Sequence, residues 1–403
     1  MTENSKNREK RMAEYEAANI REWYWFTGLP KIGRRKQELL LKAFKNVTEL
    51  YNIAENTGED AAEKLIIKAF SASNTAGNTT GSGAGCDETV KVLLDRELKK
   101  KLNAEYDRIL CSDVKMVSID SVNYPDRLKD IFDAPYILYY RGCLPDEEKK
   151  TAALVGSRAC SEYGRSMAKD SASGLAANDV QIVSGFARGI DTAAHNGCLG
   201  AAGGKTFAVF GSGINYCYPP ENRFTYDEII EKGGGIVSEY PPDTKPVPGF
   251  FPMRNRIISG LSDIVIVVEA GSKSGALITA DHAIEQGRTV MALPGRATDR
   301  LSVGCNALIR QGAGIITGMD DIYFELGIPE LKNDKKVPKS EKNQNELAKP
   351  EKMLYSQLDF NPQGIDDLIR KSRLAPDEVS ACLVRMELAG LVKRIGGMYV
   401  RGK

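Results

Sequence analysis

"AALVGSRACSEYGRSMAKDSASGLAANDVQIVSGFARGID", residues 152–191, contains two short apolar runs separated by a longer amphipathic stretch. The runs at 152–155 and 180–183 have the length and composition of buried strands, and each ends in glycine and polar residues. Between them, "SEYGRSMAKDSASGLAAN" is long enough for a helix of several turns. Two strands of one sheet that are joined through a helix are parallel. The stretch therefore predicts a strand, a helix and a second, parallel strand.

The same alternation continues to residue 317. Further short apolar runs, most of them bounded by Gly or Pro, are "TFAVFGSG", "GGIVSEY", "DIVIVVEA", "RTVMALPG" and "GAGIIT". Amphipathic stretches such as "SGALITADHAIEQG" lie between most of them. Strands that alternate with helices predict a mostly parallel sheet covered on both faces. We therefore expect an α/β fold with a Rossmann-like core, in which ligands bind at the carboxyl ends of the strands.

Two polar stretches predict linkers. They are "SASNTAGNTTGSGAGC" (71–86) and "PELKNDKKVPKSEKNQNELAKPEK" (329–352), and both lack the apolar side chains that a core needs. The predicted organisation is an all-α N-terminal domain at 1–70, a linker and helix at 71–104, the Rossmann-like core at 105–328, a disordered linker at 329–350, and a small C-terminal domain at 351–403.

Composition restricts the classes of protein and site that the 403 residues can form. The net charge is +1, so a nucleic-acid site would have to come from a local cluster of cations. No apolar run reaches the roughly 18 residues of a membrane span, and the charged N-terminus has no apolar signal segment. Eight cysteines without a CxxC pair and two histidines disfavour a zinc site or a disulfide framework. We expect a cytoplasmic protein with no membrane contact, no metal and no cofactor.

Glycines, hydroxyls and cations follow several of the predicted strands. The loops are Gly156-Ser157-Arg158, Ser184 to Asp191, Glu269 to Gly275 with Lys273, and Pro294-Gly295-Arg296. Glycine lets the backbone approach a phosphate, and the amides of a helix N-terminus donate to it. Arginine offers a planar fork that matches phosphate oxygens. Because parallel strands end at one edge of the sheet, these loops together predict an anionic ligand there.

A further stretch, "FPMRNRIISGLS" (251–262), precedes the strand at 263–270 and so reaches the same edge. Cations and aromatic residues are interleaved here within 12 residues: Lys245, Phe250, Phe251, Arg254 and Arg256. Such interleaving is typical of sites for single-stranded nucleic acid, in which cations follow phosphates and rings stack on bases. The alternative, buried rings beside a solvated helix end, remains open from the residues alone.

Other chemistries find less support in the sequence. A dinucleotide site needs GxGxxG after the first strand, where this chain has "GSRACS". Asp191 and His195 can share a helix face, but no Ser or Cys is spaced with them as a nucleophile, so a helix-start Asp and a packed His are the simpler interpretation. Glu269 is the best single candidate for a general base, and one carboxylate is thin support for an enzyme.

Several longer motifs occur in a fixed order. They are "GSRACSEYG", "SGFARGIDTAAH", "YPPEN", "SEYPP", "FPMRNRIISGLS", "VVEAGSKSGALITA", "ALPG" and "NALIRQGA". Over residues 105–326 they resemble the DNA-processing protein A family (DprA, also called Smf). The resemblance implies a non-enzymatic protein that binds single-stranded DNA, protects DNA entering during natural transformation, and loads the RecA recombinase. It also implies a homodimer formed through the Rossmann-like domain.

The resemblance further implies which residues bind DNA. Carried over motif by motif, they are Gly156, Ser157 and Arg158 of "GSR", Ser184, Gly185, Arg188 and Gly189 of "SGFARGID", Phe251, Arg254, Asn255 and Arg256 of "FPMRNR", and Ser274 and Gly275 of "SKSG". Lys245 lies where a pocket lysine is expected. Arg254 and Arg256 are two apart, so on a helix they point in different directions. One could hold phosphate while the other braces the loop, and the sequence leaves open which.

The flanking domains resemble the family's flanking domains. Residues 26–44 are similar to its helix–hairpin–helix or SAM-like segment, with Lys31 in place of the first glycine of a G-h-G hairpin. Residues 351–403 are similar to its winged helix, with "APDEVSACLVRMELAGLV" as the recognition-type helix and "KRIGGMYV" as the wing. That helix carries Asp377, Glu378, Glu387 and a single arginine, Arg385. A helix that reads DNA should carry several basic or amide residues, so we predict that this domain docks protein, or its own core, instead.

One enzymatic alternative has a related fold. Nucleotide phosphoribohydrolases of the lysine-decarboxylase-like class, which act on nucleoside monophosphates, also place glycine-rich loops at this edge. Their motif requires a glutamate one turn into the helix after the strand. Here the corresponding segment holds Ile278 and Thr279. The sequence therefore favours a binding protein for single-stranded DNA over this enzyme.

Overall fold

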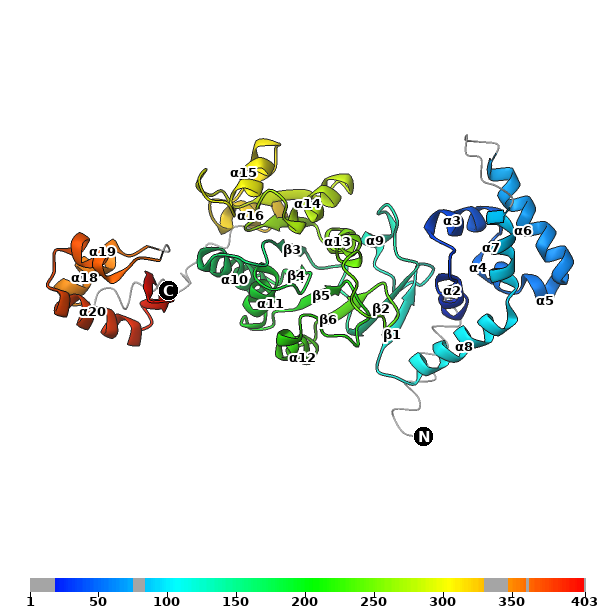
Figure 1. Cartoon of the computed structure of the whole chain (residues 1–403), viewed down its shortest axis with the longest axis horizontal. Coiled ribbons are helices and arrows are strands. Elements are labelled where there is room, and N and C mark those ends of the chain that lie inside the picture. The colour runs from blue at the N-terminus through cyan, green and yellow to red at the C-terminus, as the bar shows by residue number, and fades with distance from the viewer. Residues whose placement is uncertain (1–18, 75–83, 330–346, 360–361, 402–403) are drawn as a thin grey trace. The chain divides into compact units, whose positions relative to one another are not determined.

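The computed structural model describes residues 19–74, 84–329, 347–359 and 362–401. The described residues fall into two compact units. The larger includes the N-terminal helices and most of the α/β core, and ends at Met319. The smaller includes the C-terminal domain together with residues 160–167. Figure 1 colours the chain from its N-terminus to its C-terminus and labels the helices and strands.

The N-terminal region is all helical, as expected. Its described helices are α2 (Ile20–Thr27), α3 (Arg34–Ala43), α4 (Val47–Tyr51), α5 (Ile53–Thr57), α6 (Glu59–Asn74), α7 (Ala84–Leu94) and α8 (Arg96–Leu110). Trp23, Trp25 and Phe26 of α2 are buried in the core between them, because apolar side chains recur along one helix at short spacing. Both described ends of the predicted linker at 71–86 are helical, and residues 75–83 lie outside the described residues.

A nine-stranded sheet forms the centre of the larger unit, with strand order β1-β2-β6-β5-β4-β3-β7-β8-β9. Seven strands run parallel, at the places where the apolar runs predict them: β3 (Thr151–Val155), β4 (Gln181–Ser184), β5 (Thr206–Phe210), β6 (Gly235–Ser238), β7 (Ile264–Val267), β8 (Thr289–Ala292) and β9 (Gly314–Ile315). The mostly parallel α/β core is confirmed. The sequence analysis did not predict β1 (Lys115–Ser118) and β2 (Ile137–Gly142), which add an antiparallel edge beside β6.

Helices cover both faces of the sheet (Figure 1). The connecting helices are α9 (Asp126–Lys129), α10 (Glu162–Ala177), α11 (Ile190–Leu199), α12 (Arg223–Glu231), α13 (Phe250–Gly260), α14 (Gly275–Glu285) and α15 (Val303–Arg310). Successive residues of β5 point to opposite faces, and Phe207 and Val209 belong to the apolar cluster that also contains residues of α13, α14 and α15. Ala208 and Phe210 pack with α11, α12 and the N-terminal helices. The two apolar layers leave the ends of the strands as the place for a ligand.

The strand order reverses at β3. The chain proceeds from β3 through β4 and β5 to β6 on one side, and then crosses back to β7 on the other side of β3. In an open parallel sheet the loops on either side of such a reversal diverge and leave a crevice at the carboxyl ends of the strands. The loops after β3 and β7 therefore border the expected ligand site.

The smaller unit contains a winged helix, as the sequence predicts. It consists of α18 (Lys349–Gln357), α19 (Ile365–Ser372), α20 (Pro376–Leu388) and a hairpin of β10 (Val392–Ile395) and β11 (Met398–Arg401). Leu354, Leu368, Cys382 and Leu383 form its apolar core. Helix α16 (Met319–Leu326) precedes these elements in the chain. Most of the predicted linker at 329–350 lies outside the described residues.

Candidate nucleic-acid interface

The loop after β3 begins with a tightly packed glycine. A Cβ on Gly156 would lie 2.6 Å from Cγ1 of Ile190 and 2.9 Å from the carbonyl oxygen of Glu269, so a larger residue would displace one of its neighbours. The next amide, of Ser157, donates to that same Glu269 carbonyl at 2.7 Å. The chain then turns, with the Ser157 hydroxyl accepting from the amide of Ala159 at 3.2 Å. This turn leaves Arg158 exposed at the crevice.

The loop after β4 packs directly against the first one. Gly189 has a φ of +81°, and a Cβ there would overlap the carbonyl oxygen of Ser157 and lie 2.7 Å from that of Arg158. A Cβ on Gly185 would lie 2.7 Å from Oδ2 of Asp191 and 2.8 Å from Nη2 of Arg254. Glycine at both places lets three segments converge, so these residues shape the site through the space that they leave.

The two arginines of "FPMRNR" point to different surroundings, although both lie on α13. Arg254 is 4 % exposed, and its Nη1 donates to the carbonyl oxygens of Gly185, at 2.7 Å, and Val209. Arg256 turns to the opposite side, where Nη1 and Nη2 each donate to a carboxylate oxygen of Glu239 at 2.7 Å. Arg254 therefore belongs to the floor of the crevice, whereas Arg256 braces α13 against the end of β6.

Helix α14 begins at the same place. Ser274 is its N-cap, and its hydroxyl accepts from the amide of Ala276 at 3.4 Å. Asn255 of α13 donates from Nδ2 to the carbonyl oxygen of Gly275 at 3.1 Å, which ties the two helices together at the crevice. The helix N-terminus adds amide donors and a favourable field for an anion beside the exposed Lys273.

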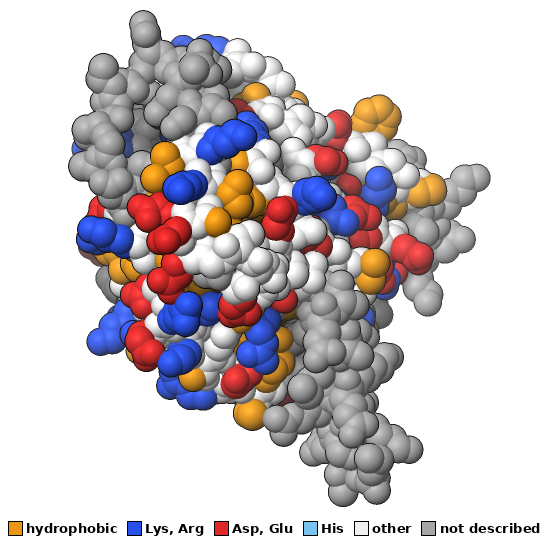
Figure 2. Space-filling model, turned by 90° about the vertical axis from the view of Figure 1, so that its right-hand side faces the viewer, with side chains coloured by type: hydrophobic (Ala, Val, Ile, Leu, Met, Phe, Trp, Pro, Cys, Tyr) orange, Lys and Arg blue, Asp and Glu red, His pale blue; other side chains and the backbone are white. Residues whose placement is uncertain are grey.

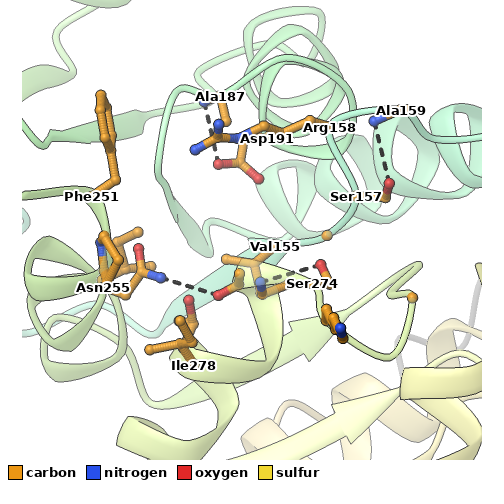
Figure 3. Close-up of a pocket in the computed structure, with 18 of the residues that line it drawn as sticks. Val155, Ser157, Arg158, Ala159, Ala187, Asp191, Phe251, Asn255, Ser274 and Ile278 are labelled. Carbon is orange, nitrogen blue, oxygen red and sulfur yellow. Dashed lines mark hydrogen bonds between the residues drawn. The ribbon is translucent and has the colours of Figure 1, made fainter. Parts of the chain in front are cut away.

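These segments enclose a cavity of about 1030 Å³. In Figure 3, Phe251 and Asn255 come from α13, Ile278 comes from α14, Arg158 comes from the loop after β3, and Asp191 comes from the start of α11. Among the described residues, four cationic side chains line it: Arg158, Arg254, Lys273 and Arg300. Asp191 is the acidic residue among the described lining residues. The excess of positive charge fits a polyanionic ligand.

Aromatic rings border the cavity beside the cations. The ring centroids of Phe251 and Tyr218 lie 5.6 Å apart, and the Arg158 guanidinium carbon lies 5.7 Å from the Phe251 centroid. Tyr218 is 44 % exposed, so its ring is accessible to a ligand. The neighbouring Phe250 stacks on Tyr240 with centroids 4.2 Å apart, and it holds the first turn of α13.

Burial changes the ionisation of the charged groups at the floor. It lowers the pKa of Arg254 to about 10, so the guanidinium stays charged at neutral pH. It raises the pKa of Asp191 to about 6, against the opposing effect of Arg254. Burial also lowers the pKa of His195 to about 3, and Nδ1 of that ring lies 2.7 Å from Oγ1 of Thr206. His195 is a neutral, packed side chain, in line with the simpler interpretation of its sequence position.

The structure brings most of the predicted site residues together. The cavity is lined by Gly156, Ser157, Arg158, Phe251, Arg254, Asn255, Ser274 and Gly275. Gly185 and Arg188 line a small adjoining hollow with Arg158, Phe251 and Arg254. Among the described residues, four predicted positions line neither space: Ser184, Gly189, Lys245 and Arg256. Ser184 is buried with its hydroxyl donating to the carbonyl of Leu154 at 2.6 Å, and Lys245 is exposed.

Sequence reasoning left out some lining residues. Lys273 was named among the cations that follow the strands but was not included in the DNA-binding set, and Tyr218 lies in the quoted motif "YPPEN", which was available as a signal. Arg296 was the cation expected after β8, but the described lining cation from that connection is Arg300. Arg300 carried no local signal, because its position depends on how the long loop folds back over the sheet edge.

Two cations of the flanking domains pair with carboxylates within the protein. Lys31 adopts a left-handed backbone, with φ +62°, where a hairpin glycine was expected, and its Nζ lies 2.6 Å from Glu88. Figure 2 shows basic and acidic side chains interspersed on the face that it displays. In the winged helix, Nε of Arg385 lies 2.6 Å from Glu351. That this domain docks protein, or its own core, stays a prediction.

Among the described residues, no helix combines the length and the apolar character that crossing a membrane requires. Likewise, no group of three or more potential metal ligands occurs in the described part of the chain.

Comparison with known proteins identifies the family. Residues 115–327 match the model of the DNA recombination-mediator protein A family, and residues 338–398 match the DprA winged helix domain. DNA processing protein DprA of Streptococcus pneumoniae is 46% identical over 203 residues, which are 50% of this chain and 71% of that protein. Protein Smf of Escherichia coli is 37% identical over 288 residues, 71% of this chain and 77% of that protein.

The fold has a solved relative as well. The crystal structure of the Streptococcus pneumoniae DprA matches with a TM-score of 0.54 and 36% identity, covering 73% of this chain and 98% of that chain. The sequence motifs, the parallel sheet and the winged helix agree with these matches. This chain is a member of the DNA recombination-mediator protein A family, and its role lies in DNA processing during recombination.

Proposed function

We propose that the protein binds single-stranded DNA in the cavity at the carboxyl edge of the sheet. The observation that carries the proposal is the lining itself, where Arg158, Arg254, Lys273 and Arg300 surround a space bordered by aromatic rings. Cations provide sites for successive phosphates, and exposed rings provide stacking surfaces for bases. Membership of a DNA recombination-mediator family supports the same ligand.

The cationic lining residues differ in their exposure, and therefore in how they would contact a phosphate backbone. Arg158, Lys273 and Arg300 are exposed, so they can follow a backbone that enters from solvent. Arg254 is held by the carbonyls of Gly185 and Val209, and therefore presents a fixed charge at the floor. A charge that is already positioned loses little side-chain entropy when a phosphate arrives.

The remaining lining suits bases. Tyr218 and Phe251 offer rings, and stacking contributes about 1–3 kcal/mol for each base. Ile258, Ile278 and Val303 supply an apolar wall. These contacts depend on ring and alkyl surfaces and not on base edges, so the expected binding is tolerant of sequence.

We further propose that the protein protects DNA entering during natural transformation and loads RecA on it, as a homodimer in the cytoplasm where that DNA arrives. The resemblance to the DprA family supports these finer roles. Comparing the rate at which RecA filaments form on single strands, with and without this protein, tests the loading role. An unchanged rate would contradict it.

The proposed role is non-enzymatic. The helix after β7 presents Ile278 and Thr279 to the cavity, at the register where the phosphoribohydrolase class needs a glutamate. Asp191, the acidic residue of the described lining, is 6 % exposed and accepts from the amide of Ala187 at 3.3 Å. Incubation with nucleoside monophosphates should release no base, and release that disappears in Glu269→Gln would favour the enzyme instead.

Binding of single-stranded oligomers to the wild type and to Arg158→Ala tests the site. The wild type should bind with an affinity that falls with salt, and each phosphate contact contributes a slope of about −0.7. Arg158→Ala should bind about tenfold or more weakly, since a hydrogen bond to a charged group contributes about 1.5–3 kcal/mol. The matched control is Arg296→Ala, an exposed arginine of the same edge that does not line the cavity. Equal losses of affinity in Arg158→Ala and Arg296→Ala would show that the DNA site does not lie in this cavity.

A further inference from the structure

An aspartate outside the cavity lies between two arginines from different parts of the chain. Asp133 follows α9, and its Oδ1 lies 2.9 Å from Nε of Arg34 in the N-terminal helix α3. Its Oδ2 lies 3.6 Å from Nε of Arg256 in α13. Backbone contacts reinforce both pairs, because Arg34 donates to the carbonyl of Ala134 at 2.8 Å and Arg256 donates to that of Asp133 at 2.9 Å.

This bridge is partly buried. The side-chain exposures are 29 % for Arg34, 19 % for Asp133 and 7 % for Arg256. Charges in such positions are screened by salt much less than surface pairs, and loss of one partner leaves the others poorly solvated. Asp133 also has a φ of +61°, a conformation that aspartate tolerates better than most residues do. The two arginines hold this turn from opposite sides.

The N-terminal end of the bridge is firmly anchored. The guanidinium carbon of Arg34 lies 3.8 Å from the ring centroid of Tyr136, which stacks on Trp23 of α2 with centroids 4.8 Å apart. The indole of Trp23 donates to Asp120 at 2.7 Å. The N-terminal helices are therefore attached to the same short segment that carries Asp133.

The other end of the bridge reaches the proposed DNA site. Arg256 lies two residues after Arg254 on α13, and Glu239 at the end of β6 holds it with two hydrogen bonds of 2.7 Å. The next residue, Tyr240, stacks on Phe250 in the first turn of that helix. Anything that moves Arg256 therefore moves the helix that carries Phe251 and Arg254.

We propose that the N-terminal helical domain positions α13 through the chain of contacts Arg34–Asp133–Arg256, and so sets the geometry of the cavity. Arg34 is a positioning residue that acts on the ligand through Asp133 and Arg256. The inference rests on the proposed binding of single-stranded DNA. It also assigns a use to the hairpin segment, whose Lys31 and Arg34 are engaged within the protein.

Single-stranded oligomer binding by the full chain tests this role. Arg34→Ala and Asp133→Asn should each weaken binding about three- to tenfold. The double variant should be no weaker than the stronger single loss, because both substitutions break one chain of contacts. Arg34→Lys keeps the charge but not the fork, and should recover part of the affinity. The matched control is Arg35→Ala, the exposed neighbour on α3, which should bind as the wild type does.

The salt dependence separates positioning from direct contact. A lost phosphate contact reduces the slope by about 0.7, as expected for Arg158→Ala. Arg34→Ala should keep the wild-type slope at a lower affinity, and its unfolding midpoint identifies any loss that is due to unfolding. Wild-type affinity in Arg34→Ala, additive losses in the double variant, or a reduced slope would each overturn the inference. If the wild type does not bind single strands, or Arg158→Ala has no effect, the proposed function itself fails. If the wild type binds, Arg158→Ala binds more weakly and Arg34→Ala keeps the wild-type affinity, only the inference fails.

Discussion

Two regions of this chain have the form of DNA-binding modules, and they use their arginines differently. In the cavity, Arg158 is exposed and backbone carbonyls hold Arg254, so both present positive charge to the space. In the winged helix, the arginine of α20 is Arg385, and Glu351 at 2.6 Å neutralises it. The comparison predicts that the charge available on a module's surface, and not its shape alone, decides whether it binds DNA.

The exposed face of α20 also differs from the cavity in its apolar and acidic side chains. Val384 and Leu388 are 55 % and 85 % exposed, and they lie one turn apart on the same side of the helix. Asp377, Glu378 and Glu387 add negative charge to that helix. An apolar, acidic surface repels a phosphate backbone, which supports the prediction that the winged helix docks protein.

The largest expected effect comes from removing the buried charge of the cavity floor. Arg254→Ala leaves the carbonyls of Gly185 and Val209 without their donor and Asp191 without its neighbouring cation. Breaking a buried charged contact costs about 3–5 kcal/mol of unfolding free energy, and DNA binding should be lost with it. Denaturant unfolding and oligomer binding measure both. Arg254→Lys is the control for charge, and it should not restore two carbonyl contacts. A stable, binding-competent Arg254→Ala would show that the floor charge is dispensable.

Two glycines with similar positive φ angles, Gly189 and Gly397, sharpen the comparison between the regions. Gly189→Ala introduces a Cβ that overlaps the Ser157 carbonyl, so it should lower the unfolding free energy by more than the roughly 1–2 kcal/mol of a left-handed residue and should weaken binding. Gly397→Ala in the wing also has a positive φ, of +84°, but no atom lies within 4 Å of the added Cβ. Gly397→Ala should lower the unfolding free energy only by the cost of placing alanine at a positive φ, and it should leave DNA binding unchanged. Thermal unfolding and oligomer titration of both variants provide the measurement, and equal effects would argue against close loop packing as the basis of the site.

Alanine substitution of one arginine in each region tests the comparison directly. Arg158→Ala should weaken single-strand binding about 10- to 100-fold, while Arg385→Ala should change neither single-strand nor duplex affinity. Gel-shift titrations with both DNA forms measure this. A loss in Arg385→Ala comparable to that in Arg158→Ala would mean that α20 contacts DNA.

The smallest effect expected is a dependence of affinity on pH. Burial raises the pKa of Asp191 to about 6, and a phosphate beside Arg254 and Arg158 would favour the neutral acid further. The carboxylate is ionised above this pH and protonated below it. DNA affinity should therefore rise about three- to tenfold as the pH falls through 6. Titrations between pH 5 and 8 check the sign, and Asp191→Asn should remove the dependence. A profile that survives this substitution would point to another group.

Much of the fold could be predicted from local patterns. The runs at β3 to β9 are short and apolar, and helices separate most of them, so a parallel sheet is their common solution. The antiparallel β1 and β2 were not predicted, because "KMVS" and "ILYYRG" have no crossover helix of several turns between them. They join the sheet only because β2 pairs with the distant β6 and β1 pairs with β2. Pairing between distant segments has no local signature.

The sequence by itself determined the α/β core, the winged helix, the edge of the sheet where an anion would bind, and the family through its ordered motifs. Tertiary structure alone decided which arginine serves the cavity. Arg254 and Arg256 are two residues apart, yet their partners Gly185 and Asp133 lie 69 and 123 residues away along the chain. A side chain's neighbours decide whether its charge is neutralised or available, and only folding brings those neighbours together. The N-terminal hairpin follows the same rule, since Arg34 meets Asp133 only in the folded protein.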